Sequence, residues 1–261
     1  MGCPQTQGQA AGSVNASSEP QPHPPRWLVG TATYNEAENL PRLVSAVRTA
    51  MPAADLLVID DASPDGTGAL ADALAAADPQ IKVLHRSGKL GLGTAILTGM
   101  SYATAHEYDF FINLDADFSH DPKYLPAMAD RAAAADVVIG SRYIPGGGVR
   151  NWPWSRYLIS RLVNVLCRVL LGLPANDVSG GYRCYRTDLL RRLRLVDLRS
   201  RGYSFQEEML YRCKQAGARI REVPIVFVDR DRGQSKVNVH EMVRSLAVLL
   251  GLGWQAWVND R

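Results

Sequence analysis

The stretch WLVGTATYNEAENLPRLVSAVRTAMPAADLLVID, residues 27–60, decides the fold. It contains two short apolar runs, at 27–33 and 56–60, and residues 37–50 between them carry a helical pattern. A strand, a helix of this length and a second strand form a right-handed βαβ unit, in which the two strands are parallel. The stretch therefore predicts the first unit of an α/β fold.

The same alternation continues along the chain. Further apolar runs lie at 81–85, 110–114 and 137–140, and helical stretches at 67–77, 91–105 and 122–135 separate the runs. The runs LLVID and DVVIG are apolar without alternation, which is typical of strands covered on both faces. We therefore predict a mostly parallel, Rossmann-like sheet with helices on both faces. Beyond it we expect helices at 155–171, 188–198, 205–215 and 239–257, and a strand at 220–228.

Composition limits the function classes. Hydrophobic residues make up 46% and charged residues 21%, which indicates a globular chain, and the net charge of +3 is too small to indicate a nucleic-acid partner. The four cysteines form no CxxC pair, so we expect reduced thiols and no zinc site. No apolar run reaches the ~18–20 residues of a membrane-spanning helix.

The chain divides into three predicted parts. Residues 1–25 are rich in Pro, Gln and Ser, and we expect a disordered leader. Residues 26–245 should form the folded domain. Residues 246–261 read as an apolar helix, which could be buried, face a membrane or contact a small membrane subunit.

Polar residues follow four of the predicted strands. In open α/β sheets, ligands bind beyond the carboxyl ends of the strands, so these residues should line one site. They are Tyr34-Asn35-Glu36, Asp60-Asp61, Asp115-Ala116-Asp117 and Ser141-Arg142.

Asp115 and Asp117 are the clearest candidates for metal chemistry. In an extended backbone their carboxylates share one side, which suits a hard divalent cation that also takes diphosphate oxygens. A metal placed so would neutralise a leaving nucleoside diphosphate. The alternative is a turn or a helix cap before Pro122. Asp61 could accept hydrogen bonds from the ring N–H groups of a nucleobase.

Four other segments carry charged residues that could contact a phosphate, a membrane or a sugar. RDRGQSK at 230–236 could reach a diphosphate with its three cations, or could be a solvated turn. Residues 155–171 form an amphipathic pattern preceded by Trp154 and bearing Arg156 and Arg161, which suits a bilayer surface, although such a helix could also pack on the core. The basic tract 183–201 reads as a phosphate-attracting or membrane-facing surface. Glu207 and Glu208 could pair with arginine or orient sugar hydroxyls.

Six segments in order resemble one known family. They are ATYNEAENL, IDDASPDGT, GLGTAILTG, NLDADFSHDP, VIGSRY and RDRGQSK, within residues 27–245. Together they resemble the dolichyl-phosphate (polyprenyl-phosphate) mannosyltransferases, which are family 2 glycosyltransferases with a GT-A fold. One departure is Ala32, where that family usually has proline.

The resemblance implies a role for each matching position. The nucleotide and donor site would include Thr33, Tyr34, Glu36, Asp61, Asp115, Ala116 and Asp117, with Asp61 at the base and the Ala116 backbone near the donor. Asp115 and Asp117 would hold Mg²⁺ or Mn²⁺. The catalytic set would be Asp117, Arg142, Arg230 and Lys236, with Arg142 on phosphate or sugar and the last two closing over the diphosphate. Arg156, Arg161 and Trp154 would face the acceptor or the membrane.

The implied reaction moves mannose from GDP-mannose to a polyprenyl phosphate with inversion, giving a β-linked product and GDP. A phosphate acceptor is already largely anionic, so no catalytic base is required. The enzyme would bind peripherally at the cytoplasmic face of a membrane, without nucleic acid. Two alternatives are a related enzyme that uses UDP-glucose or another nucleotide sugar, and a non-catalytic nucleotide-binding scaffold.

Overall fold

The computed structural model describes residues 23–193, 195, 198 and 204–229. Most of the predicted leader, the RDRGQSK segment with Arg230 and Lys236, and the apolar helix predicted at 246–261 lie outside the described residues. No helix within the described ranges is long and apolar enough to cross a membrane.

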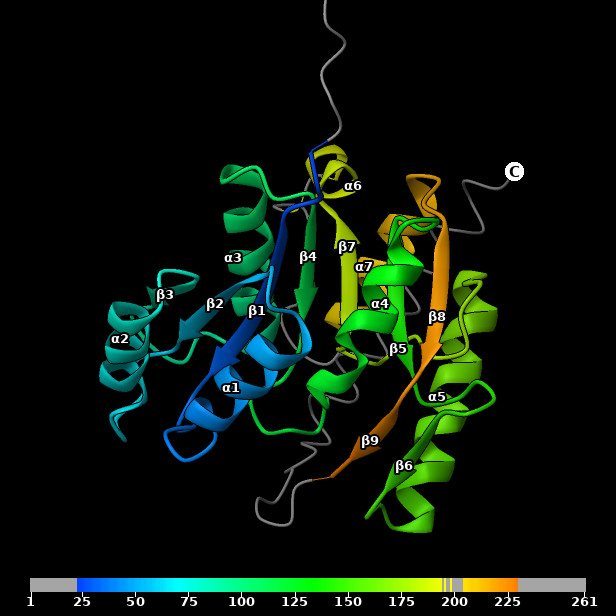
Figure 1. Ribbon diagram of the computed structural model, residues 1–261. Helices are drawn as coiled ribbons and strands as arrows, with labels where there is room; N and C mark the ends of the chain where they lie inside the picture. Colours follow the sequence, from blue (N-terminus) through cyan, green and yellow to red (C-terminus); the bar gives the residue numbers. More distant parts are fainter. Residues whose placement is uncertain (1–22, 194, 196–197, 199–203, 230–261) are drawn as a thin grey trace, which may run out of the picture.

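A seven-stranded sheet forms the centre of the molecule (Figure 1). Its strand order is β3-β2-β1-β4-β7-β5-β8, and β7 runs antiparallel to both neighbours while all other neighbouring pairs are parallel. The mostly parallel sheet is therefore confirmed. The strands are β1 (Trp27–Thr33), β2 (Asp55–Asp60), β3 (Ile81–His85), β4 (Phe110–Asn113), β5 (Val137–Ser141), β7 (Arg183–Arg186) and β8 (Ile220–Pro224).

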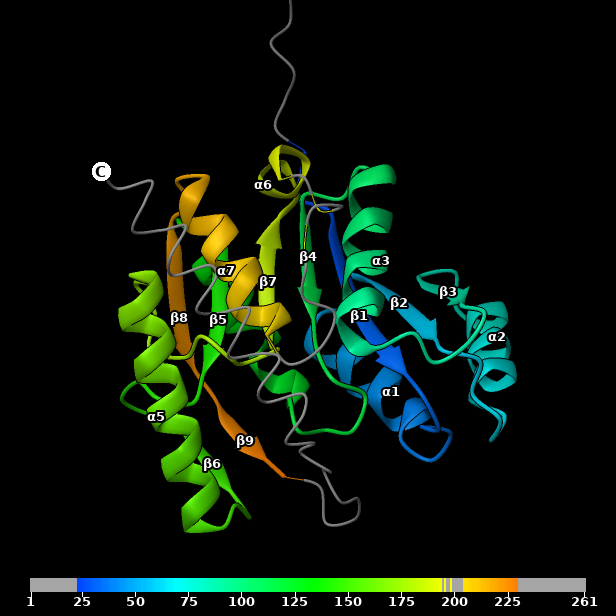
Figure 2. The same ribbon diagram turned by 180° about the vertical axis from the view of Figure 1, so that it is seen from behind.

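Helices cover both faces of this sheet, as predicted. Figure 1 shows α1 and α4 in front of the sheet, and Figure 2 shows α3, α5 and α7 on the opposite face. The face of Figure 1 carries α1 (Leu40–Ala50), α2 (Thr67–Ala77), the short 3₁₀ helix η1 (Pro122–Tyr124) and α4 (Leu125–Ala132). The other face carries α3 (Leu92–Ala105), α5 (Trp154–Leu171), α6 (Thr187–Arg192) and α7 (Phe205–Gln215).

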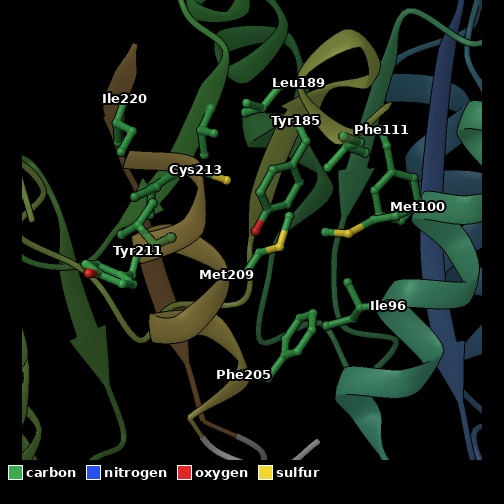
Figure 3. Packing of buried hydrophobic residues seen from close by; sticks show 14 of the residues in the cluster. Ile96, Met100, Phe111, Tyr185, Leu189, Phe205, Met209, Tyr211, Cys213 and Ile220 are labelled. Carbon is green, nitrogen blue, oxygen red and sulfur yellow. The ribbon is translucent and has the colours of Figure 1, made fainter. Parts of the chain in front are cut away.

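Each face of the sheet has its own hydrophobic cluster. In the cluster of Figure 3, Phe205 at the start of α7 lies beside Ile96 of α3, and Phe111 of β4 lies near Met100. Glycines make room for the Phe111 ring: a Cβ on Gly30 would lie 2.5 Å from it, and one on Gly99 would lie 2.7 Å away. This close approach brings β1, β4 and α3 together beneath the carboxyl ends of the strands.

A second, two-stranded sheet pairs β6 (Gly148–Arg150) in parallel with β9 (Val226–Val228). The single strand predicted at 220–228 is therefore wrong, because the chain passes from the main sheet to the small sheet after Pro224. Ile225 N–H donates to Ser141 O and Gly148 N–H donates to Ile225 O, which fixes this crossing.

One residue of the basic tract predicted as a surface at 183–201 is corrected by the structure. Arg183 lies in β7 and is fully buried. Its guanidinium donates to the carbonyl oxygens of Val178, Gly180 and Gln206 at 2.7–2.8 Å. Because these carbonyls take up its hydrogen bonds, Arg183 serves the fold and does not form a phosphate-attracting or membrane-facing surface. The helix predicted at 188–198 is shorter than expected and ends at Arg192.

Candidate active site

The strand order places a topological switch point between β1 and β4. From β1 the chain proceeds to β2 and β3 on one side, whereas β4 lies on the other side. Ligands bind at such points in open α/β sheets. The residues that follow β1 and β4, Tyr34 and Asp115, therefore flank the expected site.

The backbone at this edge adopts a costly conformation at three non-glycine residues. Asn35, Ala62 and Phe118 have φ values of 61°, 53° and 62°, in the left-handed region. They follow β1, β2 and β4 respectively. Left-handed backbone at residues with a side chain is uncommon and concentrates at functional sites, so the local geometry agrees with the switch point.

Thr33 lies inside the wall of the site. It is buried, and its hydroxyl donates to Asp60 Oδ1 at 3.0 Å. Asp60 also accepts from the backbone N–H and the hydroxyl of Ser63, and Ser63 Oγ accepts from Asn35 N–H. This network joins the loops after β1 and β2. Thr33 therefore positions the nucleotide-side loops through Asp60, and its predicted contact with a nucleotide stays a prediction.

Tyr34 and Glu36 differ in exposure. Tyr34 is the most open of the predicted nucleotide residues, and the Lys89 ammonium lies 4.2 Å from its ring centroid. Glu36 is buried: its N–H donates to Thr67 Oγ1 and its Oε2 accepts from Asn39 Nδ2. Tyr34 thus offers an exposed ring beside a cation, while Glu36 ties the loop to α1 and α2.

Asp61 has a partner that the sequence analysis missed. Arg86 Nη1 lies 2.9 Å from Asp61 Oδ1, and Leu90 N–H donates to Oδ2 at 3.2 Å. Burial raises the pKa of Asp61 above its ordinary value, and Arg86 opposes that rise. Arg86 also donates to Thr94 Oγ1. Its position directly after β3 was the available sequence signal, because that is the same edge of the sheet.

Asp115, Ala116 and Asp117 form a tight loop after β4. Asp117 Oδ1 accepts from Ser119 N–H at 2.9 Å, and Ala116 is buried. Asp115 N–H donates to His120 Nδ1 at 3.1 Å. The same Nδ1 lies 3.4 Å from Asp115 Oδ2, so the His120 ring is held against the Asp115 residue.

The chemistry of this loop fits a divalent metal. Both carboxylates are partly exposed and supply hard oxygen ligands. Among the described residues there is no cluster of three or more His, Cys, Asp or Glu side chains suited to a metal ion. A cation held here would consequently need oxygens from water or from a bound diphosphate, as a Mg²⁺ or Mn²⁺ site in a nucleotide enzyme does.

Arg142, at the end of β5, is committed to an internal partner. Its Nε and Nη2 each donate to Asp177 at 2.7 Å, its backbone N–H donates to Asp177 at 3.0 Å, and Nη2 also donates to Ser179 Oγ. Burial alone would raise the pKa of Asp177, but Arg142 outweighs it and lowers that pKa. The guanidinium also lies beside the rings of Tyr143, Trp152 and Phe227. The structure thus gives Arg142 a positioning contact, and its predicted contact with phosphate or sugar stays a prediction.

The residues around Asp177 escaped the sequence analysis. Buried Asn164 of α5 accepts from Val178 N–H and donates to Ser179 Oγ, so α5 is tied to this loop. Glu222 accepts from the backbone N–H groups of Asn176 and Asp177. The signal present in the sequence was the polar segment NDVSGG at 176–181, directly before β7.

The three residues predicted to face the acceptor or a membrane lie in the first half of α5. Arg156 pairs with Asp229 and stacks on Trp152, with 4.3 Å from its guanidinium carbon to the ring centroid. Arg161 lies over Tyr143, and Trp154 is exposed and stacks on Tyr157. They form one surface next to the small sheet.

The small sheet connects this surface with the Asp115–Asp117 loop. Val228 N–H, in β9, donates to Ser119 O at 3.4 Å, and Asp229 N–H donates to Arg150 O. Phe227 packs against His120 and Trp152. Arg230 and Lys236 lie outside the described residues, but the chain leaves the described part at Asp229, beside these contacts.

Comparison with known proteins identifies the family. Residues 28–194 match the family model described as Glycosyl transferase family 2. The chain belongs to this family. A curated undecaprenyl-phosphate mannosyltransferase of Micrococcus luteus is 48% identical over 213 residues, which cover 82% of this chain and 88% of the relative. A polyprenol monophosphomannose synthase of Mycolicibacterium smegmatis is 44% identical over 252 residues, covering 95% and 94%.

Solved structures support the fold. A glucosyl-3-phosphoglycerate synthase of Mycobacterium tuberculosis, in complex with Mn²⁺, UDP and phosphoglyceric acid, matches with a TM-score of 0.64 at 18% identity, covering 88% of this chain and 78% of the other. A mannosyltransferase of Pyrobaculum calidifontis, in complex with GDP-Man and Mn²⁺, matches with a TM-score of 0.53 at 18% identity, covering 92% and 66%. The resemblance to family 2 glycosyltransferases and the GT-A fold are confirmed.

Proposed function

We propose that this glycosyltransferase moves a mannosyl group from GDP-mannose to a polyprenyl phosphate, with inversion at the anomeric carbon. The observation that carries the proposal is the 44–48% identity to curated polyprenyl-phosphate mannose synthases over 82–95% of the chain. The site at the β1–β4 switch point supports it. Asp61 and Arg86 follow β2 and β3, the Asp115–Asp117 loop follows β4, and Arg142 follows β5.

In this proposal the donor lies across the switch point. Asp61 accepts hydrogen bonds from the base, Tyr34 and Lys89 border the nucleotide, and the Asp115–Asp117 loop meets the diphosphate. Asp115 and Asp117 would hold Mg²⁺ or Mn²⁺, which would offset the charge of the departing diphosphate. The support for a metal is the pair of partly exposed oxygen ligands on one tight loop.

The acceptor phosphate attacks without help from a catalytic base, because a phosphate monoester is largely ionised at neutral pH, with a second pKa near 6. The protein must instead hold two anions together. Arg156 and Arg161, in the first half of α5, lie on the acceptor side, where Arg161 offers a cation and Arg156 pairs with Asp229, and Arg230 and Lys236 follow β9 in sequence. The network of Arg142 and Asp177 fixes the loop behind them.

We infer that α5 rests on the membrane surface that holds the lipid acceptor. Eight of the twelve exposed large hydrophobic residues in the described part of the chain belong to this helix. They are Trp154, Leu158, Ile159, Leu162, Val163, Val165, Leu166 and Val169. The helix has arginines and no acidic residue. An apolar face with cationic side chains suits an anionic bilayer, and we place the protein peripherally at the cytoplasmic face.

The reaction is tested by incubating the protein with radiolabelled GDP-mannose, a short polyprenyl phosphate and Mn²⁺, followed by organic extraction. Label in the organic phase is expected, and UDP-glucose should give none. Asp115→Asn and Asp117→Asn should each lower the rate by about 10²–10³-fold. The matched control is Asp130→Asn, at an exposed carboxylate on α4, which should keep the full rate. Label transfer from UDP-glucose alone would establish the alternative donor, and no transfer from either would favour a scaffold.

The membrane contact is tested by co-sedimentation with anionic vesicles. The double variant Leu162→Gln, Val169→Gln changes the two most exposed aliphatic residues of α5 and should lose vesicle binding, while activity on a water-soluble short-chain acceptor stays unchanged. Ser155→Gln, at an exposed polar position of the same helix, is the control. Unchanged vesicle binding together with a marked loss of thermal stability would mean that another part of the chain covers this face.

A further inference from the structure

Two polar residues are buried side by side in the first turn of α7. Gln206 is 8% exposed and Glu207 is 4% exposed. Among the described residues no donor reaches Gln206 Oε1, and none reaches Glu207 Oε2. A buried amide or carboxyl oxygen without a donor is costly, so each calls for an explanation in function or fold.

The two side chains have different surroundings. Glu207 lies near the charges of Arg183, Asp177 and Arg142, which form the structural network behind the site. Gln206 lies on the side of Gly181: a Cβ built on Gly181 would be 3.5 Å from Gln206 Nε2 and 3.6 Å from His120 Cε1. The Gln206 amide nitrogen and the His120 ring therefore both border Gly181, and His120 contacts Asp115.

A chain of hydrogen bonds connects the backbone of Gln206 with the Asp115–Asp117 loop. Arg183 Nη1 donates to Gln206 O at 2.7 Å, and Arg183 Nε donates to Gly180 O. Asn113 Nδ2, at the end of β4, donates to Gly181 O at 3.0 Å. Asp115 follows two residues later and contacts His120. The backbone of Gln206 at the start of α7 is therefore held relative to Asp115 by buried contacts.

We propose that Gln206 recognises the sugar of the donor, by accepting a hydrogen bond from one of its hydroxyl groups. The inference rests on the proposed function for the identity of the donor. Beside the Asp115–Asp117 loop, the diphosphate has only acceptor oxygens, whereas the hexose attached to it carries hydroxyl donors. A neutral amide also suits a neutral sugar, since it adds no charge to a site that already carries two aspartates. Gln206 is then a specificity-determining residue.

The test removes the acceptor of the predicted hydrogen bond with a Gln206 variant and its donor with a deoxy sugar. Gln206→Met keeps the length of the side chain without an acceptor, and Gln206→Glu keeps an acceptor oxygen. Wild type and both variants are assayed with GDP-mannose and with GDP-linked 2-, 3-, 4- and 6-deoxymannose. With wild type, one deoxy donor should lose about 10–100-fold in kcat/KM.

The decisive result is non-additivity. Gln206→Met should lose a similar factor with GDP-mannose and no further factor with that same deoxy donor, because the partner is already gone. Gln206→Glu should recover part of the activity. Additive losses with all four deoxy donors, or an unchanged Gln206→Met enzyme, would overturn the proposal.

Binding without turnover separates this proposal from the proposed function. With Mn²⁺ present, Gln206→Met should bind GDP as wild type does and bind GDP-mannose more weakly, a difference that a folding defect would not produce. If wild type transfers no mannose, the proposed function fails, and the same comparison with UDP and UDP-glucose still tests Gln206. Equal weakening with the nucleotide and the nucleotide sugar would show a structural role only.

Discussion

Two buried ion pairs stand on opposite sides of the switch point, and they are built differently. On the nucleotide side, Arg86 approaches Asp61 through one nitrogen, and a single backbone N–H adds to it. On the acceptor side, Arg142 grips Asp177 with two parallel hydrogen bonds, and the backbone N–H groups of Arg142 and Gly180 also donate to this carboxylate.

The pKa values of the two carboxyl groups reflect this difference. The pKa of Asp61 is raised, because burial exceeds what Arg86 returns, whereas the pKa of Asp177 is lowered, because its partners exceed the cost of burial. The partners of Asp61 do not fully offset the cost of burying its charge, so a further donor such as a nucleobase N–H group would stabilise the ionised carboxylate. The Asp177 carboxylate already has such donors, so we propose ligand binding for the first pair and loop positioning for the second.

The largest expected effect follows from breaking the pair of Arg142 and Asp177. Asp177→Ala leaves the buried Arg142 guanidinium unpaired, so the free energy of unfolding should fall by about 3–5 kcal/mol. Urea denaturation followed by circular dichroism measures it. The matched control is Asp188→Asn, which breaks an exposed pair with Arg191 and should cost less than about 0.5 kcal/mol. Equal losses in the two variants would mean that the Asp177 pair is no stronger than a surface contact.

The next effect concerns binding. Asp61→Asn keeps the shape of the side chain but halves its capacity to accept from a base, so GDP should bind about 10-fold more weakly with a smaller loss of stability than Asp177→Ala. Calorimetry with GDP and Mn²⁺ measures it, and Asp72→Asn, at an exposed carboxylate that pairs with His85, is the control.

The pH dependence of the same binding gives a second readout. Since the pKa of Asp61 lies above its ordinary value, acidification should protonate it early and weaken GDP binding in wild type. The Asn variant should lack that part of the pH dependence. If wild type and Asp61→Asn bind GDP with equal affinity, Asp61 does not contact the nucleotide.

A third buried acid next to the pair of Arg142 and Asp177 titrates near neutrality. Burial raises the pKa of Glu207 from 4.5 to about 7. The folded state therefore keeps a proton that the unfolded chain releases, and the resulting stability is present below pH 4.5 and lost as pH rises towards 7. Across that window the free energy of unfolding should fall by about 1.4 kcal/mol per pH unit from this group.

Glu207→Gln should remove this slope and be more stable than wild type at pH 7 relative to pH 5. Denaturation curves at several pH values measure the difference, and Glu38→Gln, at an exposed glutamate, should keep the wild-type slope. A Glu207→Gln variant with an unchanged slope would show that another group near Arg142 takes the proton.

The contrast between the two sides also explains what the sequence could predict. Asp61, Asp115 and Asp117 each follow an apolar run, and in a parallel sheet the ends of such runs meet at one edge, so one pattern located all three. Thr33 follows the same pattern but points into the Asp60 network, a distinction that depends on side-chain direction.

The contacts on the acceptor side could not be predicted from polar residues that follow apolar runs. Arg142 meets Asp177 across 35 residues, and the strand β7 that brings them together is antiparallel and contains two arginines. Arg183 is buried because backbone carbonyls satisfy its guanidinium, and no local pattern signals such partners. Gln206 likewise becomes notable only once Gly181, which the His120 ring also borders, lies beside it.

The smallest expected effect compares the two arginines directly. Lysine carries one ammonium and cannot reproduce a planar fork, so Arg142→Lys should lower the free energy of unfolding by about 1–2 kcal/mol. At Arg86 a lysine can still offer its charge to Asp61, and Arg86→Lys should lower it by less than about 1 kcal/mol. Urea denaturation of both variants at pH 7 gives the two values. Because both arginines are buried to a similar degree, burial largely cancels in the difference, and what remains reports the contacts that each guanidinium makes, which for Arg142 include two hydrogen bonds to its carboxylate. If Arg86→Lys costs as much as Arg142→Lys, the Asp61 carboxylate is held as firmly as Asp177 and is not free to meet a base.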